Sequence, residues 1–326
     1  MIRLTELSLP LDHTPGMLRQ TILSRLGIED AELLDFTVFK RSYDARKKNT
    51  EITFVYIVDL LLSNEAQVLQ RLSAVTHVRP APDMCYVPVA RAADGCERPL
   101  VIGFGPCGLF AALVLAQMGF RPIVLERGTS VRQRTSDTWA LWRQHRLSPE
   151  SNVQFGEGGA GLFSDGKLYS QIKDPRFYGR KVMQEFVEAG APPEILFVSK
   201  PHIGTFRLTG VVATMREKIR ALGGEVRFES RVTELLLDDG RVEGVRLANG
   251  EEIASHYIVL ALGHSARDTF RMLADKGVFM EAKPFAIGFR VEHPQSQLNR
   301  ARLGKYAGHP QLGAADYKLV HHAKNG

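Results

Sequence analysis

Apolar residues with strand-like and helix-like spacing predict a small α/β unit at the start of the chain. Leu33–Phe39 and Ile52–Leu61 are rich in Val, Ile, Phe and Tyr, which favour strands. Apolar residues at helical spacing in Met17–Leu26 predict a helix that ends at the following glycine. A strand at Ile2–Leu9 and a helix at Glu65–Leu72 complete the order βαββα, which indicates a ferredoxin-like unit or a variant of it.

A linker follows this unit. Arg79–Pro82 and Pro88–Pro99 are rich in Pro, Ala and Gly and show no periodicity. A very different pattern starts at Arg98, so we place the domain boundary near residue 92. Residues 1–92 then form the small domain with its linker, and residues 93–326 form a second domain.

The second domain opens with the order strand, turn, helix, strand. Leu100–Ile102 and Ile123–Leu125 are short buried strands on either side of a helix at Pro106–Gly119. A polar, helical segment at Arg127–Leu147 and a glycine-rich loop at Asn152–Lys167 come next. These segments delay the third parallel strand, which a plain dinucleotide-binding domain would supply sooner.

The third parallel strand, at Gly224–Phe228, follows the second by about a hundred residues. An antiparallel β-meander is inserted between it and a buried strand at Tyr257–Leu262, and the pattern becomes irregular beyond Pro284. We expect amphipathic helices at Arg176–Ala189 and Leu208–Leu222, and meander strands at Arg231–Leu237, Arg241–Ala248 and Glu251–Ala254.

The strongest chemical signal is the turn from Gly103 to Gly108, which we name the fingerprint turn. Gly103 allows the tight turn, Gly105 lets the backbone approach a pyrophosphate, and Gly108 lets the helix pack close to the strand. Pro106 begins that helix, whose N-terminal N–H groups and dipole favour an anion. Glu126 ends the second strand, where it would accept hydrogen bonds from ribose hydroxyls and repel the 2′-phosphate of NADP.

The glycine-rich loop is the second informative segment. It holds five glycines between Gly156 and Gly166, which implies close backbone approach to another group. Its N–H groups could line a flavin ring or its phosphates, and Ser164 and Lys167 could reach the edge of the ring. The structural alternative is a mobile surface loop, because surface loops are often rich in glycine.

FAD and NAD share this fingerprint, so the choice between them depends on the wider layout. The delayed third strand and the meander resemble the flavoproteins of the glutathione reductase type, in which a later strand ends in Ala-x-Gly. Ala261-Leu262-Gly263 matches that turn. The resemblance implies an α/β fold, with a Rossmann-like FAD-binding domain that contains an inserted antiparallel β-meander and follows a small ferredoxin-like domain.

Across essentially the whole chain, longer strings resemble the bacterial family of uncharacterised FAD-dependent dehydrogenases. The resemblance implies FAD as cofactor and oxidoreductase activity on an unassigned substrate. Family members continue well beyond the equivalent of Lys318, so we expect a truncated chain that binds FAD weakly and has little turnover. The matching strings are Lys40–Lys48, Gly156–Leu168, Lys173–Arg176, His202–Thr205, Leu260–Asp268, Lys283–Arg290 and Gly313–Leu319.

Lys167 and His264 are the catalytic candidates, although a structural role at a helix start is an equal alternative for His264. Arg267 could bind an anion, with Asp268 as its partner or as a helix cap. We assign the cofactor contacts to the fingerprint turn, the strand ends and the glycine-rich loop. These contacts are Gly103, Gly105, Pro106, Gly108, Glu126, Arg127, Gly158, Gly159, Gly161, Ser164, Asp165, Lys167, Val232 and Gly263.

Composition narrows the classes of partner. No apolar run approaches the roughly 18 residues of a membrane span, and no signal peptide precedes the first strand. The three cysteines fit no zinc spacing, so we expect free thiols in a reducing cytoplasm and no metal site.

The net charge of +6 is uneven along the chain. Residues 1–95 hold 11 Lys and Arg against 12 Asp and Glu, a net of −1, and the remainder holds 31 against 24, a net of +7. A phosphate-rich cofactor explains the excess as well as a nucleic acid would. The basic cluster Lys40–Lys48 fits a solvated hairpin turn better than an RNA site.

The sequence therefore predicts an FAD-dependent oxidoreductase that transfers hydride through the flavin. Its substrate is unknown, and a nicotinamide is a candidate electron donor. The alternatives are a non-catalytic dinucleotide-binding fragment and an RNA-modifying flavoenzyme.

Overall fold

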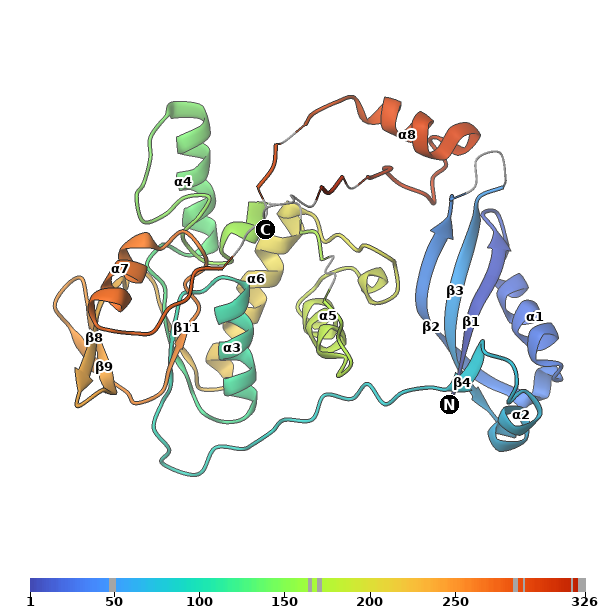
Figure 1. The fold of residues 1–326 in the computed structure, drawn as a ribbon, viewed down its shortest axis with the longest axis horizontal. Coiled ribbons are helices and arrows are strands. Elements are labelled where there is room, and N and C mark those ends of the chain that lie inside the picture. Colours follow the sequence, from blue (N-terminus) through green and yellow to red (C-terminus); the bar gives the residue numbers. More distant parts are fainter. Residues whose placement is uncertain are drawn as a thin grey trace. The chain divides into compact units, whose positions relative to one another are not determined.

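The computed structural model describes residues 1–46, 51–163, 166–168, 172–283, 287–289, 291–317 and 319–321. The chain divides into two units (Figure 1). The sequence predicted one boundary, near residue 92, whereas in the structure two later segments also belong to the first unit. The first unit is Met1–Asp83, Leu196–Ser199 and Ala282–Gly326, and the second is Met84–Ile195 and Lys200–Glu281.

The first unit contains an antiparallel sheet with the strand order β2-β3-β1-β4. Side chains that alternate along the strands, such as Leu4, Val58 and Leu60, share one buried core with Ile22 of α1. The elements are β1 (Ile2–Pro10), α1 (Pro15–Leu26), β2 (Leu33–Asp44), β3 (Thr53–Leu62), α2 (Glu65–Arg71) and β4 (Val78–Pro80), with a 3₁₀ turn at Asp30–Glu32.

Strand β4 and helix α8 (Gln295–Leu303) correct the sequence predictions. β4 overlaps the predicted linker, because only one of its three residues is apolar and Pro80 is typical of a linker, yet Val78 is buried and pairs with Leu4 of β1. α8 and a 3₁₀ turn at Gly304–Tyr306 lie in the region predicted to be irregular, and Leu303 joins the core of the first unit.

The second unit is built on a parallel sheet with the strand order β11-β5-β6-β7. Its central strands are fully buried and apolar, as expected for a parallel sheet that is covered on both faces. The strands are β5 (Leu100–Ile102), β6 (Ile123–Leu125), β7 (Glu225–Arg227) and β11 (Ile258–Leu260).

One face of the parallel sheet packs against α3 (Pro106–Gln117) and α6 (Thr205–Ala221), whose buried residues cluster with Val101 and Val124. Figure 1 shows these two helices side by side. None of the described helices is both long and apolar enough to cross a membrane. The remaining elements on this part of the chain are α4 (Val131–Gln144), α5 (Tyr178–Glu188) and 3₁₀ turns at Ala160–Phe163 and Pro193–Leu196.

The other face clusters with a small antiparallel sheet of strand order β10-β9-β8. The three strands lie between β7 and β11 in the chain, and α7, for which the sequence analysis gave no bounds, packs on β8. Leu100 and Leu125 share a core with Val245 of β9 and Leu273 of α7. These elements are β8 (Val232–Asp238), β9 (Arg241–Leu247), β10 (Glu252–Ala254) and α7 (Arg267–Asp275).

Candidate functional site

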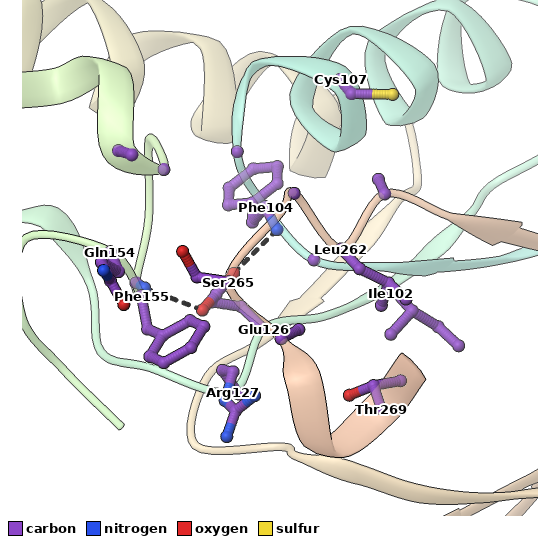
Figure 2. Close-up of a pocket in the computed structure, with 18 of the residues that line it drawn as sticks. Ile102, Phe104, Cys107, Glu126, Arg127, Gln154, Phe155, Leu262, Ser265 and Thr269 are labelled. Carbon is purple, nitrogen blue, oxygen red and sulfur yellow. Dashed lines mark hydrogen bonds between the residues drawn. The ribbon is translucent and has the colours of Figure 1, made fainter. Parts of the chain in front are cut away.

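A pocket lies where the carboxyl ends of β5, β6 and β11 come together (Figure 2). Ile102, Leu125 and Ala261 mark these strand ends in the pocket wall. Ligands of open α/β sheets bind at this edge, outside the carboxyl ends of the strands. The lining combines Ile102–Cys107, Leu125–Arg127, Gln154–Gly156, Gly159–Gly161, Ser230–Val232 and Ala261–Ala266, together with Thr269.

The glycines of the fingerprint turn are constrained in different ways. A Cβ atom on Gly103 would lie 2.5 Å from the Ala261 carbonyl oxygen, and one on Gly108 would lie 1.9 Å from the Gly103 carbonyl oxygen. A Cβ atom on Gly105 would meet only the backbone of Gly159, with its nearest atom at an ordinary 3.5 Å. The polypeptide itself therefore requires glycine at 103 and 108, whereas at 105 it leaves room for a methyl group.

Helix α3 begins directly at the pocket. Gly105 is its N-cap residue and Pro106 occupies the first helical position. The first N–H groups of any helix lack intrahelical acceptors, and the helix dipole adds positive potential at this end. One corner of the pocket therefore has a positive potential, and Cys107 lines this corner with an exposed side chain.

Glu126 is a buried hub of main-chain hydrogen bonds, and 4% of the residue is exposed. Its Oε2 accepts from the N–H of Phe104 at 2.7 Å, and its Oε1 accepts from the N–H groups of Gly128 at 2.8 Å and Gly156 at 3.0 Å. Figure 2 shows this carboxylate between the fingerprint turn and the backbone beside Phe155. Glu126 thus joins the fingerprint turn to the glycine-rich loop.

The glycine-rich loop packs directly on the fingerprint turn. The Gly158 N–H donates to the Phe104 carbonyl at 2.9 Å. A Cβ atom on Gly159 would lie 2.8 Å from the Cα of Gly105 and 3.0 Å from the Cδ of Pro106. The two backbones therefore approach as closely as their atoms allow, and the loop forms one wall of the pocket.

Arg134, on α4, organises this loop. The residue is 0% exposed, and its guanidinium donates to main-chain carbonyl oxygens of the loop. Burial lowers the pKa of Arg134 to about 10, although the negative charges of Glu126 and Glu157 oppose this shift. The acceptors are Asn152, Gly156, Glu157 and Gly159, at 2.8, 3.3, 2.7 and 2.8 Å.

Glu157 ties the same loop to two helices. Its buried Oε2 accepts from the Val131 N–H at the start of α4, at 2.6 Å, and from Arg216 of α6, at 2.7 Å. Burial raises the pKa of Glu157, and the hydrogen bond from Val131 and the charge of Arg216 offset part of the shift.

Arg127 was predicted to contact the cofactor, but in the structure its guanidinium binds side chains of the protein. Its guanidinium donates to both Asp268 oxygens at 3.0 Å and to Glu150 at 2.6 Å, and it lies 4.1 Å over the Phe155 ring. The sequence predicted Asp268 as a partner of Arg267 or as a helix cap; in the structure Asp268 binds Arg127 because the fold brings α7 to the end of β6. Burial raises the pKa of Asp268, but Arg127 outweighs this and holds it below its usual range.

Most of the other predicted residues meet at the pocket. Val232, Gly161, Gly263 and His264 line it, and His264 is exposed there. Lys167 is exposed, lies outside the described pocket lining and pairs through its backbone with His202, so its contact with the cofactor stays a prediction. Ser164 and Asp165 lie outside the described residues.

Sequence reasoning missed Arg134 and Phe155. A signal for Arg134 does exist: Val131, Arg134 and Thr138 are the buried residues of α4, so the arginine occupies the stripe that should be apolar. Phe155 lines the pocket, and its ring lies under the Arg127 guanidinium. A single aromatic residue in a loop belongs to no periodic sequence pattern, so the sequence could not single it out. Among the described residues no group of His, Cys, Asp and Glu could hold a metal ion.

Three family models match parts of the chain. Residues 198–303 match "FAD dependent oxidoreductase", and residues 284–326 match "FAD-dependent protein, C-terminal domain-like". Residues 1–61 match a domain of unknown function. Two of the three models therefore describe FAD-dependent proteins.

This chain is also similar to one curated relative and to two solved structures. An "Uncharacterized protein" of Clostridium beijerinckii is 43% identical over an alignment of 327 positions, which covers 99% of this chain and 60% of that protein. THI4 of Thermovibrio ammonificans is 19% identical with a TM-score of 0.36, covering 56% of this chain and 63% of its own. The GidA-related protein of Thermus thermophilus is 19% identical with a TM-score of 0.29, covering 51% and 52%. Residues 198–326 of this chain are thus similar to FAD-dependent proteins, and these matches support FAD binding.

Proposed function

We propose that this chain binds FAD in the pocket at the fingerprint turn and acts as the FAD-binding part of a flavin-dependent oxidoreductase. One observation carries the proposal: the fingerprint turn, Glu126 and the glycine-rich loop line a single pocket at the carboxyl edge of the parallel sheet. The chain spans about 60% of the length of the curated relative it matches, so the activity belongs to the proposal as well.

The residues present fit the adenosine and pyrophosphate half of FAD. The open position beside Gly105 lets a pyrophosphate approach the N–H groups at the start of α3. A carboxylate has about four lone-pair sites, and main-chain donors use one on Oε2 of Glu126 and two on its Oε1. The remaining site on Oε2 is the acceptor that we assign to a ribose hydroxyl.

The far sides of the pocket supply the other contacts. We assign the adenine to the wall formed by Ser230–Val232 and Phe155, and the flavin end to the wall formed by Gly159–Gly161. Ser164 and Asp165, which lie outside the described residues, stay proposed cofactor contacts from the sequence. A bound flavin would supply hydride transfer, and the chain would supply position and a defined electrostatic environment.

His264 is the stronger of the two catalytic candidates. It lines the pocket with an exposed imidazole, so it could hold or release a proton near the ligand. Lys167 lies outside the described lining, so only the sequence supports a catalytic role for it. The substrate has no assignment, and a nicotinamide remains the proposed electron donor.

The wider layout supports the glutathione reductase type. We propose that β8, β9 and β10 are the inserted meander, since they lie between the third parallel strand and β11. We also propose that the first unit is ferredoxin-like, because its order βαββαβ and its strand order β2-β3-β1-β4 follow that arrangement. A domain boundary near residue 92 and a cytoplasmic location stay proposals.

Purification under native conditions tests the function. We expect the protein, after incubation with FAD, to show the absorption spectrum of a bound flavin, and heat denaturation should release a compound with the mass of FAD. A colourless protein that gains no flavin spectrum on incubation with FAD would contradict the proposal.

A further inference from the structure

Arg134 lies outside the pocket lining, yet it controls the shape of one pocket wall. Its Nε and Nη1 atoms donate to loop carbonyls that span Asn152 to Gly159. The acceptors Gly156 and Gly159 themselves line the pocket. One side chain therefore fixes both ends of the loop segment that faces the ligand.

The burial of this cation has to be offset by the groups around it. A buried charge is costly unless it is paired and hydrogen-bonded. Here the loop carbonyls supply acceptors, and the charges of Glu126 and Glu157 favour the protonated guanidinium. Without Arg134, the loop carbonyls would lose their donor and the two carboxylates would lose a nearby positive charge.

The ordered loop in turn contacts the fingerprint turn. Gly159 packs against Gly105 and Pro106, at the point where the backbone is open to a ligand. Gly156 donates its N–H to Glu126, the proposed ribose acceptor. A shift of the loop would therefore alter both the pyrophosphate end and the ribose end of the pocket.

We propose that Arg134 is a positioning residue for the cofactor, which holds the glycine-rich loop against the fingerprint turn and thereby sets the affinity for FAD. This inference rests on the proposed function, because it concerns FAD bound in this pocket. It assigns to α4 a role that neither the fingerprint nor the pocket lining contains.

The test compares three arginine variants with the parent chain. Arg134→Met removes the donors and the charge while keeping an apolar side chain of similar length. Arg134→Lys keeps the charge and three donors on a shorter side chain. Arg132→Met is the matched control, because Arg132 lies on the same helix and is exposed. Each apo-protein is titrated with FAD, and its fold is checked by circular dichroism.

The tryptophans give a second readout of loop position. Both tryptophans of the chain lie on α4, and the Trp142 ring packs edge-on against Phe163 at 5.7 Å. Phe163 belongs to the glycine-rich loop, and its ring centroid lies 5.0 Å from the guanidinium carbon of Arg134. Release of the loop should move Phe163 and change the tryptophan emission of the apo-protein, which a loss of global stability in a still-folded protein would not do.

We expect Arg134→Met to raise the Kd for FAD roughly 10- to 100-fold and to change the tryptophan emission. Arg134→Lys should lie between Arg134→Met and the parent, and Arg132→Met should match the parent in both readouts. A folded Arg134→Met variant with the parent's Kd would overturn the inference and leave the proposed function standing. A parent chain that binds no FAD would overturn the proposed function, and the inference would fall with it.

If Arg134→Met fails to fold, Gly156→Ala decides. A Cβ atom on Gly156 would lie 2.5 Å from the Arg134 Cδ, at a backbone φ of 113° that disfavours alanine. The substitution displaces the loop from Arg134 and leaves α4 itself unchanged. We expect the same weakening of FAD binding, and an unchanged Kd would overturn the inference.

Discussion

Gly105 and Gly108 lie about one helical turn apart, but glycine is needed at the two positions for different reasons. At 105 a side chain would obstruct the proposed ligand, whereas at 108 it would obstruct the fold. Gly105→Ala should leave the melting temperature of the apo-protein nearly unchanged, since its new methyl group finds an ordinary 3.5 Å contact. The same methyl group would obstruct a pyrophosphate, so FAD binding should weaken at least tenfold, or about 1.4 kcal/mol.

Gly108→Ala is the contrasting variant. Its Cβ atom would lie 1.9 Å from the Gly103 carbonyl oxygen, so α3 has to shift away from the turn. We expect a destabilisation of about 1–3 kcal/mol, measured by urea denaturation of the apo-protein. Equal stability losses for the two alanine variants, with FAD affinity unaffected in Gly105→Ala, would contradict the assignment of the pyrophosphate to this turn.

Glu126 has a structural role as well as the proposed ribose contact, and two variants separate them. Glu126→Ala leaves the N–H groups of Phe104, Gly128 and Gly156 without their acceptor, so it should lower both stability and FAD affinity. Glu126→Gln keeps an acceptor oxygen. It should retain most of the fold while weakening FAD binding by about 1–3 kcal/mol, the range for a hydrogen bond to a charged group.

Calorimetric titration of both variants with FAD, beside thermal unfolding of each apo-protein, measures the two roles. Unchanged FAD affinity in a folded Glu126→Gln variant would limit Glu126 to organising the loop.

Within the first unit, strands β1 and β3 are joined by a buried ion pair. Arg3 donates to both oxygens of Asp59, at 2.7 and 2.8 Å, and the Phe39 ring lies 3.6 Å from the Arg3 guanidinium. Arg3→Met strands a buried carboxylate and should destabilise the protein by about 3–5 kcal/mol. The double variant Arg3→Met with Asp59→Leu should recover much of that loss, because neither charge remains buried.

Chemical denaturation of the single and double variants measures this difference. A double variant that is less stable than Arg3→Met alone would show that the pair is net stabilising over apolar packing, contrary to this expectation.

In the second unit, His256 connects the segment before β5 to the small antiparallel sheet. Its Nδ1 lies 2.8 Å from Glu97 and its Nε2 lies 3.0 Å from Glu243 of β9. The hydrogen bond with Glu97, followed by the charges of Glu97 and Glu243, raises the pKa of His256 above its ordinary 6.5. A raised pKa in the folded state means that the stabilisation is complete below pH 6.5 and is lost as the pH rises through the folded value.

The melting temperature should therefore fall as the pH rises above 6.5, and His256→Gln should flatten that dependence. The measurement is thermal unfolding across this pH range for the parent and the variant at one ionic strength. The effect should be small, because the imidazole is exposed and solvent screens the pair. Identical pH profiles for the parent and the variant would show that His256 does not contribute to the pH dependence of the melting temperature.

At the level of the whole molecule, the sequence predicted best where several local signals agree. The β5–α3–β6 unit combined buried strands, a glycine turn and a terminal acid, and the structure forms it with boundaries that differ by at most two residues. β4 was missed because its three residues, Val78 to Pro80, include a single apolar side chain, and α7 was given no bounds although Asp268 was considered as a helix cap.

The site was predictable only in its local parts. Gly103, Gly105 and Glu126 belong to one motif with fixed spacing, so they could be assigned together. Arg134 binds main-chain carbonyl groups of the loop that follows its helix, and Asp268 binds Arg127 although the two residues are 141 positions apart in the chain. Such contacts depend on how elements pack, and no spacing rule in a single sequence encodes them.

The central claim is that one FAD binds at the fingerprint pocket through its adenosine half. Titration of the apo-protein with FAD, followed by competition with ADP, tests it most directly. We predict saturation at one FAD per chain and displacement of the bound FAD by ADP. The Gly105→Val variant should bind both FAD and ADP more weakly. Absence of FAD binding, or FAD binding that neither ADP nor Gly105→Val alters, would contradict the account.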